Sequence, residues 1–156
     1  MRKLVLIAAA MLVSPVFAPR PAIAMDDRPT PAPSAELQAG RKAIEAKDWT
    51  SAIKWLSAAE RADSRNADVQ NLLGFAHRNS GQLDAAFKYY ERALQLDPRH
   101  LGAHEYVGEA YLMANNLPKA EEHLAALKRY CARMCEERDD LEKKIAEYRA
   151  RTAATK

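Results

Sequence analysis

Apolar residues recur at three- and four-residue spacing through most of the chain, which is the spacing of one face of an α-helix. Two such stripes follow one another in the middle of the chain: Leu73, Ala76 and His77, then Ala86, Tyr90 and Ala93. Gly81 lies between them and suits the left-handed backbone that ends a helix, while Pro98 cannot continue the second helix. The pattern predicts two amphipathic helices joined by a tight turn.

The same pattern recurs with a fixed period. Gly40, Gly74 and Gly108 are 34 residues apart. Four further series share this phase: Ala52, Ala86 and Ala120; Trp49, Leu83 and Leu117; Leu56, Tyr90 and Leu124; and Ala59, Ala93 and Leu127. Each repeat is one helix pair, and a single pair buries too little apolar surface to be stable alone. The period therefore predicts an all-α solenoid of three stacked units, 34–66, 67–100 and 101–134.

A further helix is expected over residues 135–150. Leu141, Ile145 and Tyr148 form one apolar stripe there, and charged residues occupy the other positions. This pattern is typical of the polar-backed helix that covers the last unit of a solenoid. A coiled-coil seam is the alternative, although the period lasts only about two heptads. Residues 151–156 are expected to be a disordered tail.

The N-terminus has the pattern of a secretory signal peptide over residues 1–24. Arg2 and Lys3 precede an apolar run, and Ala22 and Ala24 supply small residues at the −3 and −1 positions of a cleavage point before Met25. The pattern predicts export, with a bacterial periplasm as the destination.

A permanent membrane anchor is the alternative for this leader, and it would need about 18 uninterrupted apolar residues. Ser14 and Pro15 interrupt the run, so no membrane insertion is expected after cleavage. Residues 25–33 hold three prolines and no apolar periodicity, which predicts a disordered arm ahead of the first unit.

Charge and composition then narrow the class of partner. The chain has 24 Lys and Arg against 21 Asp and Glu, and Arg2, Lys3 and Arg20 of the leader account for the difference. A nearly neutral mature chain does not favour nucleic acid or an anionic membrane as a partner. Val, Ile and Thr are too scattered to supply alternating strands, which excludes an all-β fold.

The repeat resembles the tetratricopeptide repeat family. The middle unit carries its motif: Leu73-Gly74, Gly81, Ala86, Tyr90, Ala93 and Leu96-Asp97-Pro98. The outer units depart from it, with Glu36 and Ser64 in the first and Ala132 in the third at positions usually held by Trp or Pro. The resemblance implies a right-handed α-solenoid that acts as a non-catalytic protein-binding module. Its partner would be a protein or peptide, and the chain would act as an adaptor or assembly factor.

The resemblance also implies which residues line a concave groove, because the first helix of each unit faces it. The groove positions fall on Leu37, Arg41, Ile44, Asn71, Phe75, Arg78, Asn79, Glu105, Glu109, Leu112 and Met113. Phe75, Leu112 and Met113 are expected to be apolar contacts, because exposed large apolar groups usually have a partner. Arg41 and Arg78 are expected to bind polar or acidic groups at the rim. The family's clamp for a terminal carboxylate is not supported, because most of its positions hold Leu37, Leu72, Gly102 and Tyr106.

Cys131 and Cys135 are the two cysteines of the chain. Four residues of unbroken helix rise about 6 Å, near the upper limit for a disulfide, but a turn at Cys131 would bring the sulfurs closer. A structural disulfide is expected in an oxidising compartment. Two alternatives remain open: a copper or redox carrier that uses these thiols with Met134 or Met113 and a histidine, and a self-associating structural protein.

Catalytic signatures are lacking in this sequence. It has no glycine-rich phosphate loop, nucleophile elbow or zinc-ligand spacing. His77 is expected to be a hydrogen-bonded histidine packed between two helices, and His100 and His104 are not expected to share a helical face. No enzymatic activity, cofactor or bound metal is therefore predicted.

Overall fold

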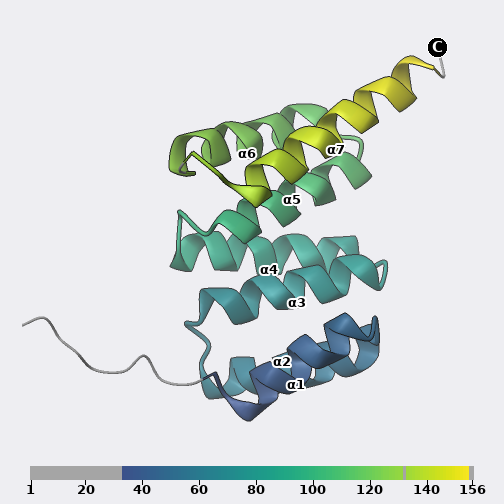
Figure 1. The fold of residues 1–156 in the computed structure, drawn as a ribbon. Coiled ribbons are helices and arrows are strands. Elements are labelled where there is room, and N and C mark those ends of the chain that lie inside the picture. Colours follow the sequence, from purple (N-terminus) through teal and green to yellow (C-terminus); the bar gives the residue numbers. More distant parts are fainter. Residues whose placement is uncertain (1–32, 132, 155–156) are drawn as a thin grey trace, which may run out of the picture. The chain divides into compact units, whose positions relative to one another are not determined.

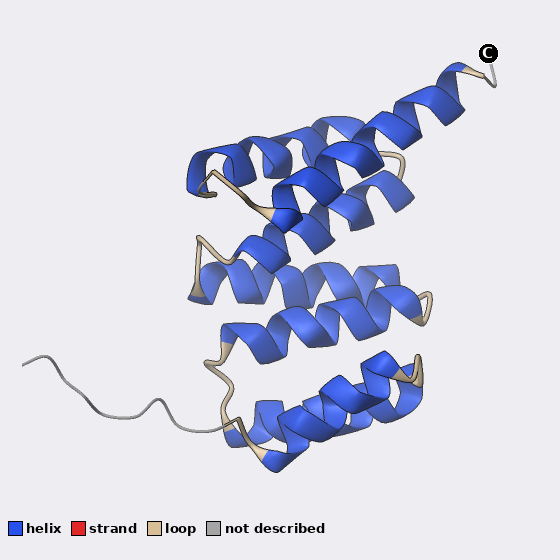
Figure 2. Ribbon diagram, in the orientation of Figure 1, coloured by secondary structure: helices blue, strands red, loops and turns tan. Residues whose placement is uncertain are grey.

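The computed structural model describes residues 33–131 and 133–154, and within them every regular element is a helix (Figures 1 and 2). The helices are α1 (Ala35–Glu45), α2 (Trp49–Ala62), α3 (Ala67–Asn79), α4 (Leu83–Leu96), α5 (Leu101–Met113), α6 (Leu117–Tyr130) and α7 (Glu136–Ala153). No described helix is long and apolar enough to cross a membrane. The predicted signal peptide, its cleavage site and all of the proline-rich arm except Pro33 lie outside the described residues.

The helices form three pairs, α1–α2, α3–α4 and α5–α6, and each pair falls within one predicted unit. Contacts are densest within a pair, and each pair also contacts the next one along the chain (Figure 1). The fold is the predicted α-solenoid, and α7 packs on α5 and α6 at its C-terminal end.

The turns inside the three units are built alike. Lys47, Gly81 and Asn115 lie 34 residues apart, and each has a positive φ, at 56°, 81° and 57°. In each turn the next backbone N–H closes a hydrogen bond to a carbonyl near the end of the preceding helix: Asp48 to Ala43, Gln82 to His77 and Asn116 to Tyr111. This is the left-handed helix end predicted at Gly81.

The repeated glycines allow neighbouring helices to approach closely. A Cβ atom on Gly40 would lie 2.6 Å from the Leu56 side chain, and one on Gly74 would lie 2.6 Å from the Tyr90 ring. Gly108 differs, because a Cβ there would meet Leu141 of α7, also at 2.6 Å. In the third unit the capping helix therefore occupies the space beside the glycine.

The helix α7 covers the last unit through its apolar stripe. Leu141, Ile145 and Tyr148 are buried in one cluster with Leu112 and residues of α6. The prediction that this helix ends at 150 is wrong by three residues, since it continues to Ala153. The Thr152 hydroxyl donates to the Tyr148 carbonyl at 3.0 Å, a side-chain hydrogen bond back to the preceding turn.

Candidate functional site

The first helices of the units form one continuous row that ends in α7. Helix α1 contacts α3, α3 contacts α5, and α5 contacts α7. Helices α5 and α7 run in the same direction, because Gly108 faces Leu141 while Leu112 lines a cavity with Tyr148 one to two turns further along. The row α1, α3, α5 and α7 is called the concave face below.

Aromatic rings join the units across this face. The Phe75 ring lies 6.0 Å from the Trp49 ring and 4.8 Å from the Tyr106 ring, centroid to centroid. Phe75 is half-buried as a result. The expectation that Phe75 is an exposed apolar contact is therefore only partly correct, because its ring also links α3 to α2 and α5.

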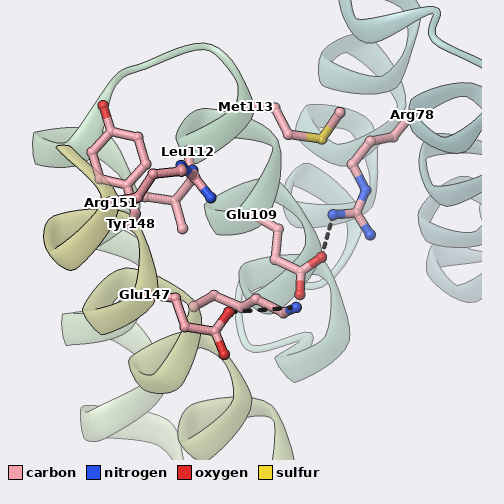
Figure 3. A pocket seen from close by; sticks show the side chains of 8 residues that line it. Arg78, Glu109, Leu112, Met113, Glu147, Tyr148 and Arg151 are labelled. Atoms are coloured by element: carbon pink, nitrogen blue, oxygen red, sulfur yellow. Dashed lines mark hydrogen bonds and ion pairs between the residues drawn. The ribbon is translucent and has the colours of Figure 1, made fainter. Parts of the chain in front are cut away.

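Arg78 is held in place by the same rings and by an acid. Its guanidinium lies 5.3 Å from the Phe75 centroid and 5.6 Å from the Tyr106 centroid, and it forms an ion pair with Glu109 of α5 (Figure 3). Arg78 is only 8% exposed. Arg78 was expected at the rim, where it would bind polar or acidic groups; it is instead buried, and its charge is already paired with Glu109.

A cavity of about 280 Å³ opens between α3, α5 and α7 (Figure 3). Its lining residues are Arg78, Glu109, Leu112, Met113, Lys144, Glu147, Tyr148 and Arg151. Leu112, Met113 and Tyr148 supply the apolar part, and charges of both signs surround it. Half of the lining comes from α7, a helix that the sequence pattern predicted only as a cap.

Glu105 is the most perturbed acid of this face. Burial raises its pKa to about 8, and the neighbouring carboxylates of Glu109, Asp140 and Glu137 contribute in the same direction. Arg78 opposes the shift. The carboxyl group therefore keeps its proton at neutral pH in the free protein.

The predicted groove residues divide by exposure. Arg41 is 48% exposed and pairs with Asp68 at 3.4 Å, Asn79 is exposed, and Met113 is 56% exposed. Ile44, Phe75, Glu105 and Glu109 are half-buried. A ligand could contact the three exposed residues fully and the four half-buried residues in part.

Four predicted groove residues are instead buried: Leu37, Asn71, Arg78 and Leu112. Leu37 packs in the core with Leu56 and Leu73, so it is a structural residue. Leu112 packs with Leu124 and Leu141 and contributes only an edge to the cavity.

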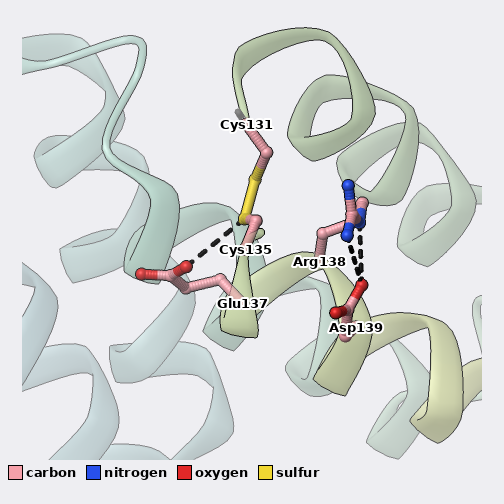
Figure 4. Close-up of a disulfide and its surroundings, with 5 residues drawn as sticks. All are labelled: Cys131, Cys135, Glu137, Arg138 and Asp139. Carbon is pink, nitrogen blue, oxygen red and sulfur yellow. Dashed lines mark hydrogen bonds and ion pairs between the residues drawn. A yellow bond between two sulfur atoms is a disulfide. The ribbon is translucent and has the colours of Figure 1, made fainter. Parts of the chain in front are cut away.

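The two cysteines lie at the junction between α6 and α7 (Figure 4). Cys131 caps the end of α6 and Cys135 caps the start of α7, and the structure joins their sulfurs with a Cα–Cα distance of 5.8 Å. The helix does end at Cys131, as expected. Within residues 33–131 and 133–154, no group of three or more His, Cys, Asp or Glu residues is placed to hold a metal ion.

The structure contains a pair of histidines that the sequence pattern did not predict. The Nδ1 atoms of His104 and His123 lie 2.9 Å apart, and His104 Nε2 lies 3.1 Å from the Pro98 carbonyl. Because a carbonyl only accepts, His104 Nε2 carries the proton and His123 Nδ1 donates to His104 Nδ1. The two residues are 19 positions apart on different helices, so helical spacing alone does not reveal them.

The other histidines behave as expected. His77 is half-buried and stacks on Tyr89 of α4 at 5.1 Å, with its Nδ1 3.2 Å from Gln82 Oε1. His100 caps α5 and pairs with Asp68 at 3.0 Å, apart from the partners of His104.

Comparison with known proteins agrees with the repeat. One model of the tetratricopeptide repeat family matches residues 37–100, and a second matches residues 77–130. Together they cover residues 37–130, which is more than half of the chain. The chain belongs to the tetratricopeptide repeat family. Its repeats form a protein-protein interaction module.

Curated relatives share only a segment with this chain. Human Protein O-mannosyl-transferase TMTC3 is 33% identical over 75 residues, which is 48% of this chain and 8% of that protein. The Uncharacterized protein ycf37 of Guillardia theta is 34% identical over 64 residues, 41% of this chain and 36% of that protein. The chain thus spans a small part of the length of these relatives.

Solved structures with the same fold include two that hold peptides. The type III secretion chaperone SycD of Yersinia enterocolitica, in complex with a peptide of the translocator YopD, has a TM-score of 0.65 and 17% identity, over 75% of this chain and 92% of that one. The first TPR domain of Spaghetti (RPAP3), bound to the HSP90 peptide SRMEEVD, has a TM-score of 0.65 and 18% identity, over 74% and 93%. At these identities the likeness concerns the fold.

Proposed function

We propose that this chain is an exported, non-catalytic adaptor or assembly factor that binds a peptide segment or short helix of another protein on its concave face. The observation that carries the proposal is the cavity between α3, α5 and α7, beside the exposed Met113 and the half-buried Phe75. A concave site with apolar floor and a few convergent polar groups is the usual form of a binding site. The signal-peptide pattern of residues 1–24 supports export to the periplasm.

The fold supports a peptide as the class of ligand. SycD and the RPAP3 domain share this fold, and each of those structures holds a bound peptide. Aromatic residues in the centre of an interface commonly contribute most of its affinity, and Phe75 lies between the rings of Trp49 and Tyr106. The surface of such a row of helices matches the length of an extended strand or of a short helix, so either could bind there.

The test compares the effect on binding of substituting two apolar residues of the concave face and one apolar residue outside it. A partner recovered by crosslinking in the native envelope is titrated by calorimetry against Phe75→Ala, Met113→Ala and Trp55→Ala. Phe75→Ala should weaken binding by about 1–3 kcal/mol. Met113→Ala should weaken it by less, and with little loss of stability because this side chain is 56% exposed.

Trp55 is the matched control, since it is 41% exposed but lies on α2, outside the concave row. Its substitution should leave binding unchanged. The thermal unfolding of each variant is measured alongside, because Phe75 also packs between helices. Normal binding by both concave variants, with loss only in Trp55→Ala, would place the interface elsewhere.

A further inference from the structure

A second cavity, of about 470 Å³, lies between α4, α5 and α6 and shares no lining residue with the cavity of the concave face. Phe87, Leu94 and Tyr111 form its apolar wall, and the Phe87 and Tyr111 ring centroids are 4.7 Å apart. Glu91 and His123 are polar members of the lining. A cavity of this size with aromatic walls and a few polar groups is typical of a binding site. The function proposed above does not use it.

Two polar groups of this second cavity are acceptors without a donor. His123 Nδ1 donates to His104, so His123 Nε2 carries a lone pair, and no described residue donates to that atom. The Glu91 side chain is exposed and forms no ion pair within the described part of the chain. The cavity therefore favours an aromatic ligand that brings an N–H donor and a positive charge.

The chain itself carries such an aromatic group on α2. Trp55 occupies the position that Tyr89 and His123 occupy in the next two units, since the three residues are 34 apart. Tyr89 and His123 each stack on a ring of the first helix of their unit, at 5.1 and 5.7 Å between centroids. In the first unit Ala43 stands in place of that ring. Trp55 thus has no ring of this kind to stack on, and it is 41% exposed.

Lys54 places a positive charge beside this exposed ring. Its Nζ lies 5.4 Å from the Trp55 ring centroid, and its side chain is exposed and forms no ion pair with any described residue. The indole N–H of Trp55 is a donor only, and it has no acceptor among the described residues. Lys54 and Trp55 together therefore complement the two unpaired acceptors of the second cavity.

Within one chain, Trp55 and the second cavity stay apart. The backbone of α2 approaches α1 and α3 but none of the helices α4, α5 and α6, and no residue of α2 lines the cavity. Trp55 can therefore enter this cavity only from a second copy of the chain.

We propose that this chain self-associates by inserting Trp55 of one copy into the second cavity of the next copy, where its indole N–H donates to His123. Lys54 then pairs with Glu91. The two surfaces differ, so each added copy leaves a free Trp55 at one end and a free cavity at the other, and copies assemble end to end. The cavity of the concave face shares none of these residues, so every copy keeps its peptide site and the inference does not rest on the proposed function.

Sedimentation equilibrium of the purified chain, at low ionic strength and up to about 1 mM protein, is the first measurement. The wild type should form dimers and larger species as its concentration rises. Trp55→Ala should weaken association roughly tenfold or more, because tryptophans are common among the residues that dominate an interface. Phe75→Ala and Met113→Ala, on the concave face, should associate as the wild type does. A wild type that stays monomeric, or a loss confined to the concave variants, would overturn the inference.

A charge exchange tests the pairing without removing the ring. Lys54→Glu and Glu91→Lys should each weaken association about five- to tenfold at low salt, because both side chains are exposed and neither supports the fold. The double variant Lys54→Glu/Glu91→Lys should regain wild-type association. Glu45→Lys is the matched control for a reversed acid at an exposed site on α1, and it should have no effect. A double variant as weak as the single ones would contradict the pairing.

Mixing two variants tests that the interface joins two different surfaces. Trp55→Ala keeps the cavity, and Glu91→Lys keeps the tryptophan. At a concentration where each variant alone is monomeric, an equal mixture should form a complex of one copy of each that does not grow further. Absence of this complex, while the wild type associates, would show a symmetric contact and overturn the inference. Peptide binding by monomeric Trp55→Ala is measured separately, so the proposed function stands or falls on its own.

Discussion

The Tyr90 ring packs directly onto the backbone at Gly74, so that a methyl group there would lie 2.6 Å from two of its ring carbons. Tyr90 is fully buried, and it is the largest such side chain among the described residues. The contact joins α3 to α4 in the middle unit. Each of the other units needs a glycine at the same point, but in the third unit the partner is Leu141 of the capping helix.

Gly74→Ala should therefore lower the free energy of unfolding by about 1–3 kcal/mol, despite the better helix propensity of alanine. Gly102→Ala is the matched control, since its new Cβ would meet the end of the Asn71 side chain at 3.3 Å. That change should be close to neutral. Urea unfolding of both variants is the measurement, and equal stability of the two would contradict the close-approach explanation.

The features of this structure that the sequence predicts are those that recur in every repeat. The 34-residue period predicts the helix pairs and the turn at Gly81, because those features depend on contacts inside one unit. Burial of Arg78 and Leu112 was not predictable, because it depends on Glu109 and α7, which belong to other units. The contribution of α7 to the cavity was not predictable either, because it also depends on contacts between different units.

The histidine pair predicts a loss of stability in mild acid. Burial and the neighbouring His104 lower the pKa of His123 to about 4, from 6.5. Between these values the unfolded chain binds a proton that the folded protein does not, so stability falls as pH decreases from about 6.5 to about 4.

His123→Gln should reduce this loss. Thermal unfolding in buffers across that range, compared with the wild type, is the measurement. Parallel curves for the two proteins would show that other groups cause the acid sensitivity.

Glu105 predicts the opposite trend at higher pH. Its pKa is raised from 4.5 to about 8, so its contribution to stability is present below 4.5 and is lost as pH rises through 8. Glu105→Gln should remove this loss and make the protein more stable than the wild type at pH 8. Glu45→Gln, at an exposed site, should leave the difference between pH 5 and pH 8 as it is in the wild type.

Export predicts a defined N-terminus. If the signal-peptide pattern is functional, protein recovered from the periplasm should have the mass of a chain that begins at Met25. Intact-mass measurement decides this directly. A product that retains Arg2 and Lys3 would indicate a retained anchor and would change the proposed localisation.

The disulfide between Cys131 and Cys135 should stabilise the capping helix more than the rest of the fold. The bond closes a loop of only a few residues, which is worth about 2 kcal/mol on the chain-entropy model. Both cysteines cap helix ends at the α6–α7 junction, and Leu141, the first buried residue of α7, lies just beyond. Loss of the bond should therefore let α7 move relative to α5 and α6.

The double variant Cys131→Ser/Cys135→Ser tests this by hydrogen exchange. Amides of α7 should exchange faster, while those of α3 and α4 should keep their wild-type protection. Because Lys144, Glu147 and Tyr148 line the cavity, peptide binding should weaken in parallel with the faster exchange.

Two free thiols in exported, denatured wild-type protein would contradict the disulfide, and stoichiometric copper in that sample would favour a metal carrier instead. Uniformly faster exchange in all helices would mean that α7 stabilises the whole solenoid and not only its last unit.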